Sequence, residues 1–178
     1  LLVVGDLCAL IAFRRHADWL KILKLIPWAG IGVVVGFFVL GNIDNAQARL
    51  LIGMSFLVMI ALHLSNRNTG NIKKSGLLAP GVGPVIGGMA GFVSMISNAA
   101  GPLMTLYLLA MQMPKMAFLG TSVYFFTLLN FFKIPFLVYL NIITIESASA
   151  NVRLVPFVVA GAFLGFSFAK RVNQLWFE

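Results

Sequence analysis

The sequence predicts an all-α polytopic membrane protein, and three observations lead to that fold class. The 178 residues are 60% hydrophobic and only 10% charged, and their mean hydropathy is +0.97. Several apolar runs approach or reach the roughly 20 residues that a helix needs to cross a bilayer core. These runs are continuous, without the alternation of apolar and polar residues that is typical of membrane barrels. The chain is therefore expected to be multi-pass and to contact the lipid bilayer.

The net charge of +8 does not indicate a nucleic-acid partner, because the basic residues form no single patch. They occur in short segments between the apolar runs, as cytoplasmic loops do under the positive-inside rule. These segments contain Arg14, Arg15, Lys21 and Lys24, then Arg67, Lys73 and Lys74, then Lys170 and Arg171. The single Cys8 allows no internal disulfide, and no Cys/His cluster suggests a metal, so we expect no metal and no cofactor.

Taken in order, the apolar runs predict the following membrane elements. Residues 1–13 resemble the end of a helix whose start lies outside the sequence. The first clear span is expected at 27–40, with Pro27 near the start of its helix. Further spans are expected at 50–64, 117–140 and 152–169, and residues 141–151 are expected to form a polar loop that holds Glu146.

The chain is organised around the uncharged stretch from Pro80 to Pro114, which is too long for one span. Its middle, residues 97–102, reads SNAAGP, where Pro102 removes a backbone donor and Gly101 adds conformational freedom. Irregular backbone at membrane depth persists only where protein buries it or water reaches it. We therefore expect two half-membrane helices that meet at a polar break, as in transporter sites. The alternative is a tightly packed helix interface, which also favours small residues.

Two charged residues lie inside apolar runs. Lys133 has apolar residues on both sides, and a buried ammonium group needs a partner or an anion. Snorkelling of the long lysine stem toward Leu140 is the alternative. Asp6 is a candidate coupling residue, although it could also reach the membrane interface from the end of its helix.

Two spans share the pattern Pro-x4-Gly-x3-Gly, from Pro27 and from Pro156, an offset of 129 residues. The pattern predicts two repeats in a protein of about 258 residues, so the chain is expected to lack part of the first repeat and the C-terminal end. The expected domains are 1–64 (the remainder of the first repeat), 65–79 (a polar basic linker) and 80–178 (the second repeat, broken at 97–102). If residues 80–114 form a re-entrant hairpin, the charges of all the loops agree with the positive-inside rule. The repeats are then inverted, and parallel repeats remain the alternative.

Several segments resemble the sulfite exporter TauE/SafE family. These are GDL at 5–7, FRRHADW at 13–19 and LIPW at 25–28, then GFVSMISNAAGP at 91–102, GTS at 120–122 and NFFKIP at 130–135. The resemblance covers essentially the whole chain and implies a bacterial plasma-membrane carrier of small sulfur-containing anions, such as sulfite or organosulfonates, with proton coupling. Many members have a GxGGG-type turn where this chain has SNAAG at 97–101, a departure that leaves the substrate open.

The expected function is a secondary transporter, not an enzyme, in which a half-helix N-terminus and hydrogen-bond donors hold the anion and Lys133 balances its charge. The expected substrate-binding residues are Ser94, Ser97, Asn98, Ala99, Ala100, Gly101, Thr121, Ser122, Asn130 and Lys133. The alternative functions are a cation/proton antiporter or an anion channel on the same plan. An intramembrane protease is disfavoured because His16 and His63 lie in a loop and at a span end, and a scaffold without a site would leave Lys133 and Asn98 unexplained. The oligomeric state is open, a homodimer being one alternative.

Overall fold

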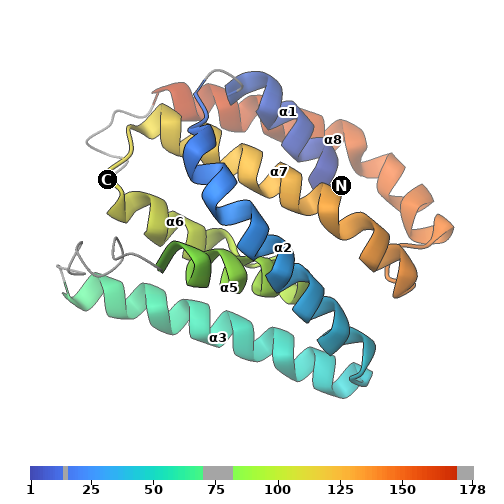
Figure 1. The fold of residues 1–178 in the computed structure, drawn as a ribbon. Coiled ribbons are helices and arrows are strands. Elements are labelled where there is room, and N and C mark those ends of the chain that lie inside the picture. Colours follow the sequence, from blue (N-terminus) through green and yellow to red (C-terminus); the bar gives the residue numbers. More distant parts are fainter. Residues whose placement is uncertain (14–15, 70–81, 172–178) are drawn as a thin grey trace. The chain divides into compact units, whose positions relative to one another are not determined.

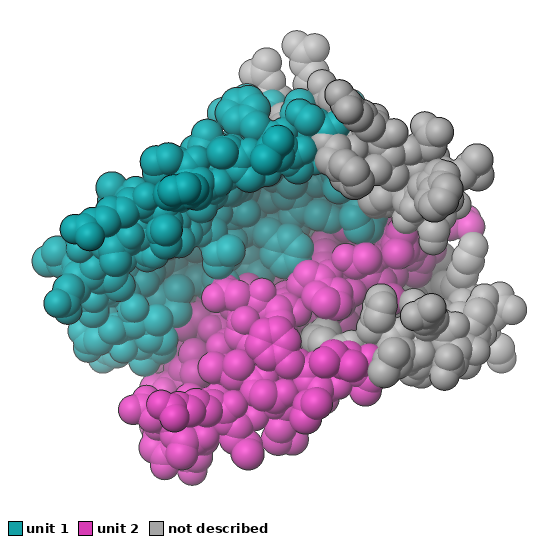
Figure 2. All heavy atoms as spheres, turned by 180° about the vertical axis from the view of Figure 1, so that it is seen from behind, with its two compact units in different colours: residues 1–22, 114–178 teal, residues 23–113 magenta. Residues whose placement is uncertain are grey.

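The computed structural model describes residues 1–13, 16–69 and 82–171, and these form helices joined by short connections with no strand among them (Figure 1). The chain divides into two compact units, shown in Figure 2, and each is described by itself. Unit 1 contains residues 1–22 and 114–178, and unit 2 contains residues 23–113. The helices are α1 (Leu2–Phe13), α2 (Trp19–Gly41), α3 (Asn45–Thr69), α5 (Val82–Ser97), α6 (Gly101–Ala110), α7 (Lys115–Tyr139) and α8 (Ile145–Arg171).

Among the described residues, three helices are long and apolar enough to cross a membrane. They cover Trp19–Gly41, Lys115–Tyr139 and Ile145–Ser167. Shorter apolar helices cover Leu2–Ile11, Val82–Ser97 and Gly101–Ala110. The all-helical fold predicted from composition is therefore confirmed, and three of the described helices could span a membrane.

Two expectations about helix boundaries were wrong. Pro27 lies well inside α2, because the helix already begins at Trp19. Such prolines are tolerated in membrane helices, where neighbouring helices re-satisfy the freed backbone groups. The loop expected at 141–151 is also too long, because α8 begins at Ile145 and includes Glu146 in its first turn.

A reciprocal capping arrangement explains the early start of α8. The Thr144 amide donates to the Ser147 hydroxyl at 3.0 Å, and the Ser147 amide donates to the Thr144 hydroxyl at 3.1 Å. The start of α3 has the same arrangement between Asp44 and Gln47, whose amides donate to each other's side-chain oxygens. Each pair satisfies an amide that the first helical turn would otherwise leave without a partner.

The polar linker expected at 65–79 is partly helical, since α3 continues to Thr69, and its remainder lies outside the described residues. The two compact units do not follow the expected boundaries at 64 and 80. Spatial units and sequence repeats are different divisions, so the repeat boundaries remain a prediction.

In unit 1, α1 and α7 pack side by side and run antiparallel. Asp6 on α1 contacts Asn130 on α7, whereas Asp18, after the end of α1, contacts Thr121 near the beginning of α7. Residue numbers therefore rise along one helix as they fall along the other. Residues 16–18 pass close to α7, because a Cβ on Gly120 would lie 2.8 Å from the carbonyl carbon of His16 and the Asp18 amide donates to Thr121.

Helix α8 packs against α1 in the parallel direction. A Cβ on Gly5 would lie 3.6 Å from a methyl carbon of Val158, and the rings of Phe13 and Phe166 meet edge to face with centroids 5.4 Å apart. Edge-to-face contact is a favoured geometry for aromatic pairs. Helix α1 thus lies against both long helices of unit 1.

In unit 2, α5 and α6 form an antiparallel hairpin, with α6 returning toward the start of α5 (Figure 1). A Cβ on Gly83, at the beginning of α5, would lie 3.0 Å from the hydroxyl of Tyr107, in the second half of α6. Helix α3 contacts both members of the hairpin. The segment from 82 to 110 is therefore not one continuous rod.

Helix α5 also packs against α2 at very short distance, through glycines on both helices. A Cβ on Gly32 would overlap the carbonyl oxygen of Gly88 and lie 2.8 Å from the amide nitrogen of Phe92. A Cβ on Gly91 would overlap the carbonyl oxygen of Ala29. These contacts place backbone against backbone, which only glycine permits at such a distance. The hairpin is thereby held against α2.

Candidate functional site

The break between α5 and α6 occurs where the sequence analysis expected it. Helix α5 ends at Ser97, α6 begins at Gly101, and the three residues between them are not helical. Asn98 has a φ of 54°, in the left-handed region, and its amide donates to the carbonyl oxygen of Ser94 at 3.2 Å. This is the single hydrogen bond of a left-handed helix C-cap, a position that Asn tolerates better than most residues.

The role expected of Gly101 and Pro102 in this break needs correction. Pro102 lies in the first turn of α6, where its missing N–H costs nothing, and so it begins a helix and does not interrupt one. Gly101 does not adopt a left-handed φ; Asn98 does. Asn98 is exposed, and its presence is explained at least in part by this backbone conformation.

Two serines lie on the last turns of α5. Ser94 is buried, with 3% of its surface exposed, and Ser97 is half-buried. The Ser97 hydroxyl donates to the carbonyl oxygen of Val93 at 3.1 Å and accepts a hydrogen bond from the Ser55 hydroxyl at 3.0 Å. Sequence reasoning missed Ser55 on α3, because a single serine in an apolar run gives no signal of its partner.

The N-terminus of α6 faces the same break. Its N-cap residue is Ala100, which is buried and whose side chain cannot accept a hydrogen bond, so no side chain caps the helix. The first amides of a helix lack intrahelical acceptors, and the helix dipole makes this end partly positive. The first amides of α6 thus lie at the break without a side-chain cap, and the anion-binding role expected of residues 99–101 stays a prediction.

A second polar cluster lies in unit 1, on the contact between α1 and α7. The side-chain amide of Asn130 donates to the Asp6 carboxylate at 2.6 Å, and Asp6 interacts electrostatically with Lys133. Lys133 is only 2% exposed and Asn130 only 9%. The snorkelling alternative for Lys133 is therefore disfavoured, because its side chain is buried beside a carboxylate.

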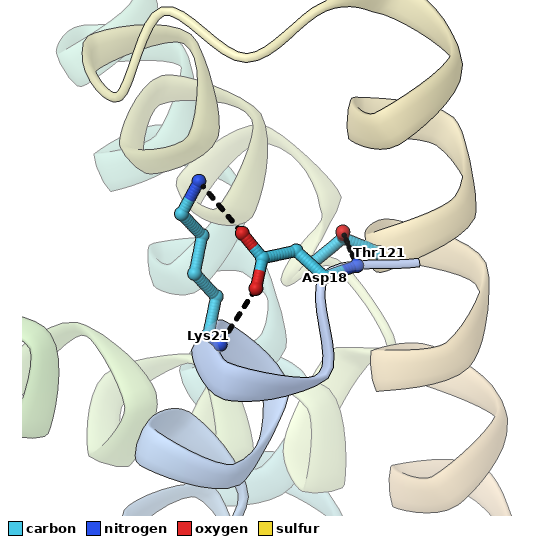
Figure 3. A network of polar contacts seen from close by, with 3 residues as sticks. All are labelled: Asp18, Lys21 and Thr121. Atoms are coloured by element: carbon cyan, nitrogen blue, oxygen red, sulfur yellow. Dashed lines mark hydrogen bonds and ion pairs between the residues drawn. The ribbon is translucent and has the colours of Figure 1, made fainter. Parts of the chain in front are cut away.

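Thr121 is fully buried, and it accepts a hydrogen bond from the backbone amide of Asp18 at 2.9 Å (Figure 3). The Asp18 carboxylate accepts from the Lys21 amide at 3.3 Å and pairs with the Lys21 ammonium at 3.1 Å. These contacts fasten the start of α2 to α7. They give Thr121 a structural role, while Ser122 beside it is half-buried.

Asp18 lies just before the membrane-length part of α2, and its ionisation is shifted. Desolvation would raise the pKa of Asp18, but the hydrogen bonds from the Lys21 side chain and backbone, with the lysine charge, outweigh it and lower the pKa below its ordinary value. The ionised carboxylate is thus favoured at the N-terminus of α2, as the helix dipole also favours.

The predicted site residues therefore fall into two groups. Residues 94–101 lie together in unit 2, at the break, and Thr121, Ser122, Asn130 and Lys133 lie along α7 in unit 1, with Asp6 against Asn130 and Lys133. The close association of Asp6 with Asn130 and Lys133 was not predicted from the sequence. Asp6 and Asn130 are 124 positions apart, and nothing in the local sequence of either residue indicates that the fold brings them together.

Three cavities in the described part of the chain are lined mainly by apolar side chains. One of about 310 Å³ in unit 1 is lined by Cys8, Ile11, Ala162, Phe163 and Phe166. A neighbouring one of about 420 Å³ lies among α1, α7 and α8 and shares Cys8, Ala162 and Phe166 with it. The third, of about 230 Å³, lies between α3 and α5, with Ser55 as its polar lining residue. None of the three offers the charged or multiple polar groups that an anion requires, so the two polar clusters are the better candidates.

The structure combines membrane-length helices with a pair of apolar helices that meet at a polar turn. This combination is typical of integral membrane proteins of the transporter class. The chain belongs to the sulfite exporter TauE/SafE family, whose model matches residues 1–178, the whole chain. The family resemblance seen in the sequence is thereby confirmed, and the family consists of transporters, not enzymes. No curated protein and no solved structure matches the chain significantly.

Proposed function

We propose that the protein is a secondary transporter that moves small sulfur-containing anions, sulfite or organosulfonates, across the bacterial plasma membrane with ion coupling. The observation that carries this proposal is the break between α5 and α6, an irregular polar turn inside an otherwise apolar segment. Membership of the sulfite exporter family supports the substrate class. Discontinuous helices of this kind present helix ends and backbone groups to substrates in many transporters.

The hairpin geometry supports a re-entrant element. Helices α5 and α6 have 16 and 10 residues, so they are about 24 Å and 15 Å long, and neither crosses a hydrocarbon core of about 30 Å. Because they run antiparallel, both can enter from and return to one side of the membrane. The break would then lie within the bilayer, at a depth suited to a substrate site.

The antiparallel packing of α1 and α7 supports inverted repeats over parallel ones. Each of these helices precedes a helix with the Pro-x4-Gly-x3-Gly pattern, since α1 leads to α2 and α7 leads to α8. Equivalent helices of parallel repeats would run in the same direction, whereas those of inverted repeats run in opposite directions. Alternating access would rock one repeat against the other around the broken helices.

In this proposal the turn at residues 97–101 holds the anion through backbone N–H groups and the hydroxyls of Ser94 and Ser97. Within unit 1, and separately from this turn, Asn130 supplies a donor and Lys133 a positive charge, and Asp6 couples transport to a second ion. The side-chain amide of Asn98 is a further donor. Its contribution to anion binding has to be distinguished experimentally from the effect of Asn98 on the conformation of the turn.

Flux into proteoliposomes tests the function directly. The full-length protein is expected to move sulfite or an organosulfonate faster than chloride, and a pH gradient should drive accumulation. Anion flux that runs only down its own gradient, without accumulation, would favour an anion channel. Cation-for-proton exchange without anion movement would favour the antiporter.

A pair of variants at position 98 tests the site. Asn98→Gly keeps the left-handed φ but removes the side-chain amide. Asn98→Ala also removes the side-chain amide and, in addition, strains the backbone. Loss of sulfonate flux in Asn98→Gly would assign the amide to substrate binding. Unchanged flux in Asn98→Gly with loss in Asn98→Ala would restrict Asn98 to shaping the turn.

A further inference from the structure

The buried charges of unit 1 carry an inference about how the proposed transport is coupled, and it rests on the proposed function. Asn130 and Lys133 are three residues apart on α7, so their side chains lie on one face of the helix. Both interact with the same residue of α1, because Asn130 donates to the Asp6 carboxylate and Lys133 attracts it electrostatically. The three side chains thus form one buried cluster across the α1–α7 contact.

The location of this cluster in apolar helices determines what it can do. A charged side chain inside the membrane is costly unless an opposite charge and hydrogen bonds compensate it. The Asp6 carboxylate compensates the Lys133 ammonium, and Asn130 satisfies part of the remaining hydrogen-bonding capacity of Asp6. Asp6 therefore supplies an opposite charge for Lys133 in the described state, before any substrate anion arrives.

We propose that Asp6 is the internal counter-ion of Lys133, and that a small anion takes its place when Asp6 accepts a proton. The charge balance is simple. A carboxylate and an ammonium sum to zero, and a protonated carboxyl, an ammonium and a monovalent anion also sum to zero. One proton from the aqueous phase forms the O–H bond of Asp6 and no other covalent bond changes. Each anion bound is thus accompanied by one proton.

Asn130 can serve both states of this exchange. Its N–H donates to the ionised Asp6 carboxylate, and its amide oxygen can accept from the protonated carboxyl after rotation of the amide. In the described part of the chain, Lys133 is the buried side-chain cation that acts on Asp6, so it is the cation that the exchange uses.

Binding of methanesulfonate to the purified full-length protein, measured by calorimetry at several pH values, tests the proposal. The sulfonate stays ionised across this range, so any pH dependence belongs to the protein. Wild-type affinity is expected to fall as the pH rises, with a limiting slope of about tenfold per pH unit, as uptake of one proton requires. Asp6→Asn, which mimics the protonated carboxyl, should bind methanesulfonate more tightly and without pH dependence.

Further variants separate this exchange from a purely structural ion pair. Lys133→Met should abolish binding, and the double variant Asp6→Asn/Lys133→Met should recover thermal stability without recovering binding. The matched control is Asp18→Asn, which removes the acid of the exposed ion pair in the same unit and should leave the pH slope unchanged. A folded Asp6→Asn protein that keeps the wild-type pH slope, or that no longer binds, would overturn the counter-ion exchange alone. A wild-type protein that binds no sulfonate, sulfite or thiosulfate would overturn both the exchange and the transport function.

Discussion

Helices α2 and α8 carry the same spacing of proline and glycine, yet their glycines have different surroundings. In α2, a Cβ on Gly32 would overlap the backbone of α5, and a Cβ on Gly36 would lie 2.9 Å from the Cβ of Met95. In α8, a Cβ on Gly161 or Gly165 would have no other described atom within 4 Å. One glycine face is therefore used for close helix packing and the other is open in the described part of the chain.

This difference teaches that a glycine pattern permits a close helix contact but does not create it. The contact also needs a partner with small residues at matching positions, as α5 has at Gly88 and Gly91. If the repeats are equivalent, the corresponding partner of α8 would be a broken helix of the first repeat. The comparison can be tested position by position.

The largest effect is expected for Gly32→Ala. The added Cβ would meet the backbone of Gly88 and Phe92, which cannot rotate away, so α2 and α5 must separate. We expect a net loss of about 3 kcal/mol in the free energy of unfolding. This is the loss that remains after the gain of roughly 1 kcal/mol from the higher helix propensity of alanine. Unfolding of the full-length protein in detergent measures it. Unchanged stability would mean that the α2–α5 contact is not as close as described.

A smaller loss is expected for Gly36→Ala. Here the added Cβ would lie 2.9 Å from the Cβ and 3.1 Å from the Cγ of Met95, a much smaller overlap than at Gly32, so a slight shift between the two helices relieves it. We expect a loss of about 1 kcal/mol in the same unfolding measurement. A loss as large as that of Gly32→Ala would show that the tight contact extends further along α2.

The matched variant in α8, Gly161→Ala, is expected to cost nothing in the described packing. Its Cβ would enter open space, and the higher helix propensity of alanine favours a gain of up to about 1 kcal/mol. Unfolding in detergent again measures the change. A cost comparable to that of Gly32→Ala would instead show that another helix covers this face in the full-length protein.

The smallest effect concerns how α2 begins. Asp18→Asn keeps an N-cap side chain but removes the charge that pairs with Lys21. Because this ion pair is partly exposed, we expect a loss of less than about 1 kcal/mol in the free energy of unfolding. The pKa of Asp18 is lowered in the folded protein, so its charge contributes to the stability of the fold. This contribution is complete at pH values above the unfolded pKa of about 3.9, and it is lost as the pH falls through the lower folded pKa. The stability difference between wild type and Asp18→Asn should therefore be present at neutral pH and shrink in acid. A difference that grows in acid would contradict the direction of the shift.

Much of the fold followed from sequence because its signals are local. A long apolar run indicates a membrane helix wherever it occurs, and an uncharged run with SNAAGP in its middle indicates a break. The boundaries were less predictable, since the starts of α2 and α8 depend on capping contacts at Asp18 and Thr144 that hydrophobicity does not report. The turn also depends on Asn98, not on Gly101 and Pro102, because backbone dihedrals at a helix end are shared among neighbouring residues.

By itself, the sequence determined the class of protein, the number of apolar runs, the position of the break and the presence of two charges where lipid disfavours them. Only the tertiary structure decided that these two charges belong to one cluster, that Ser55 meets Ser97 and that the glycines of α2, not those of α8, meet a partner. The physical reason is distance along the chain. Hydrophobicity and backbone conformation act on neighbouring residues, whereas ion pairs and helix contacts join residues that only the packing of helices brings together.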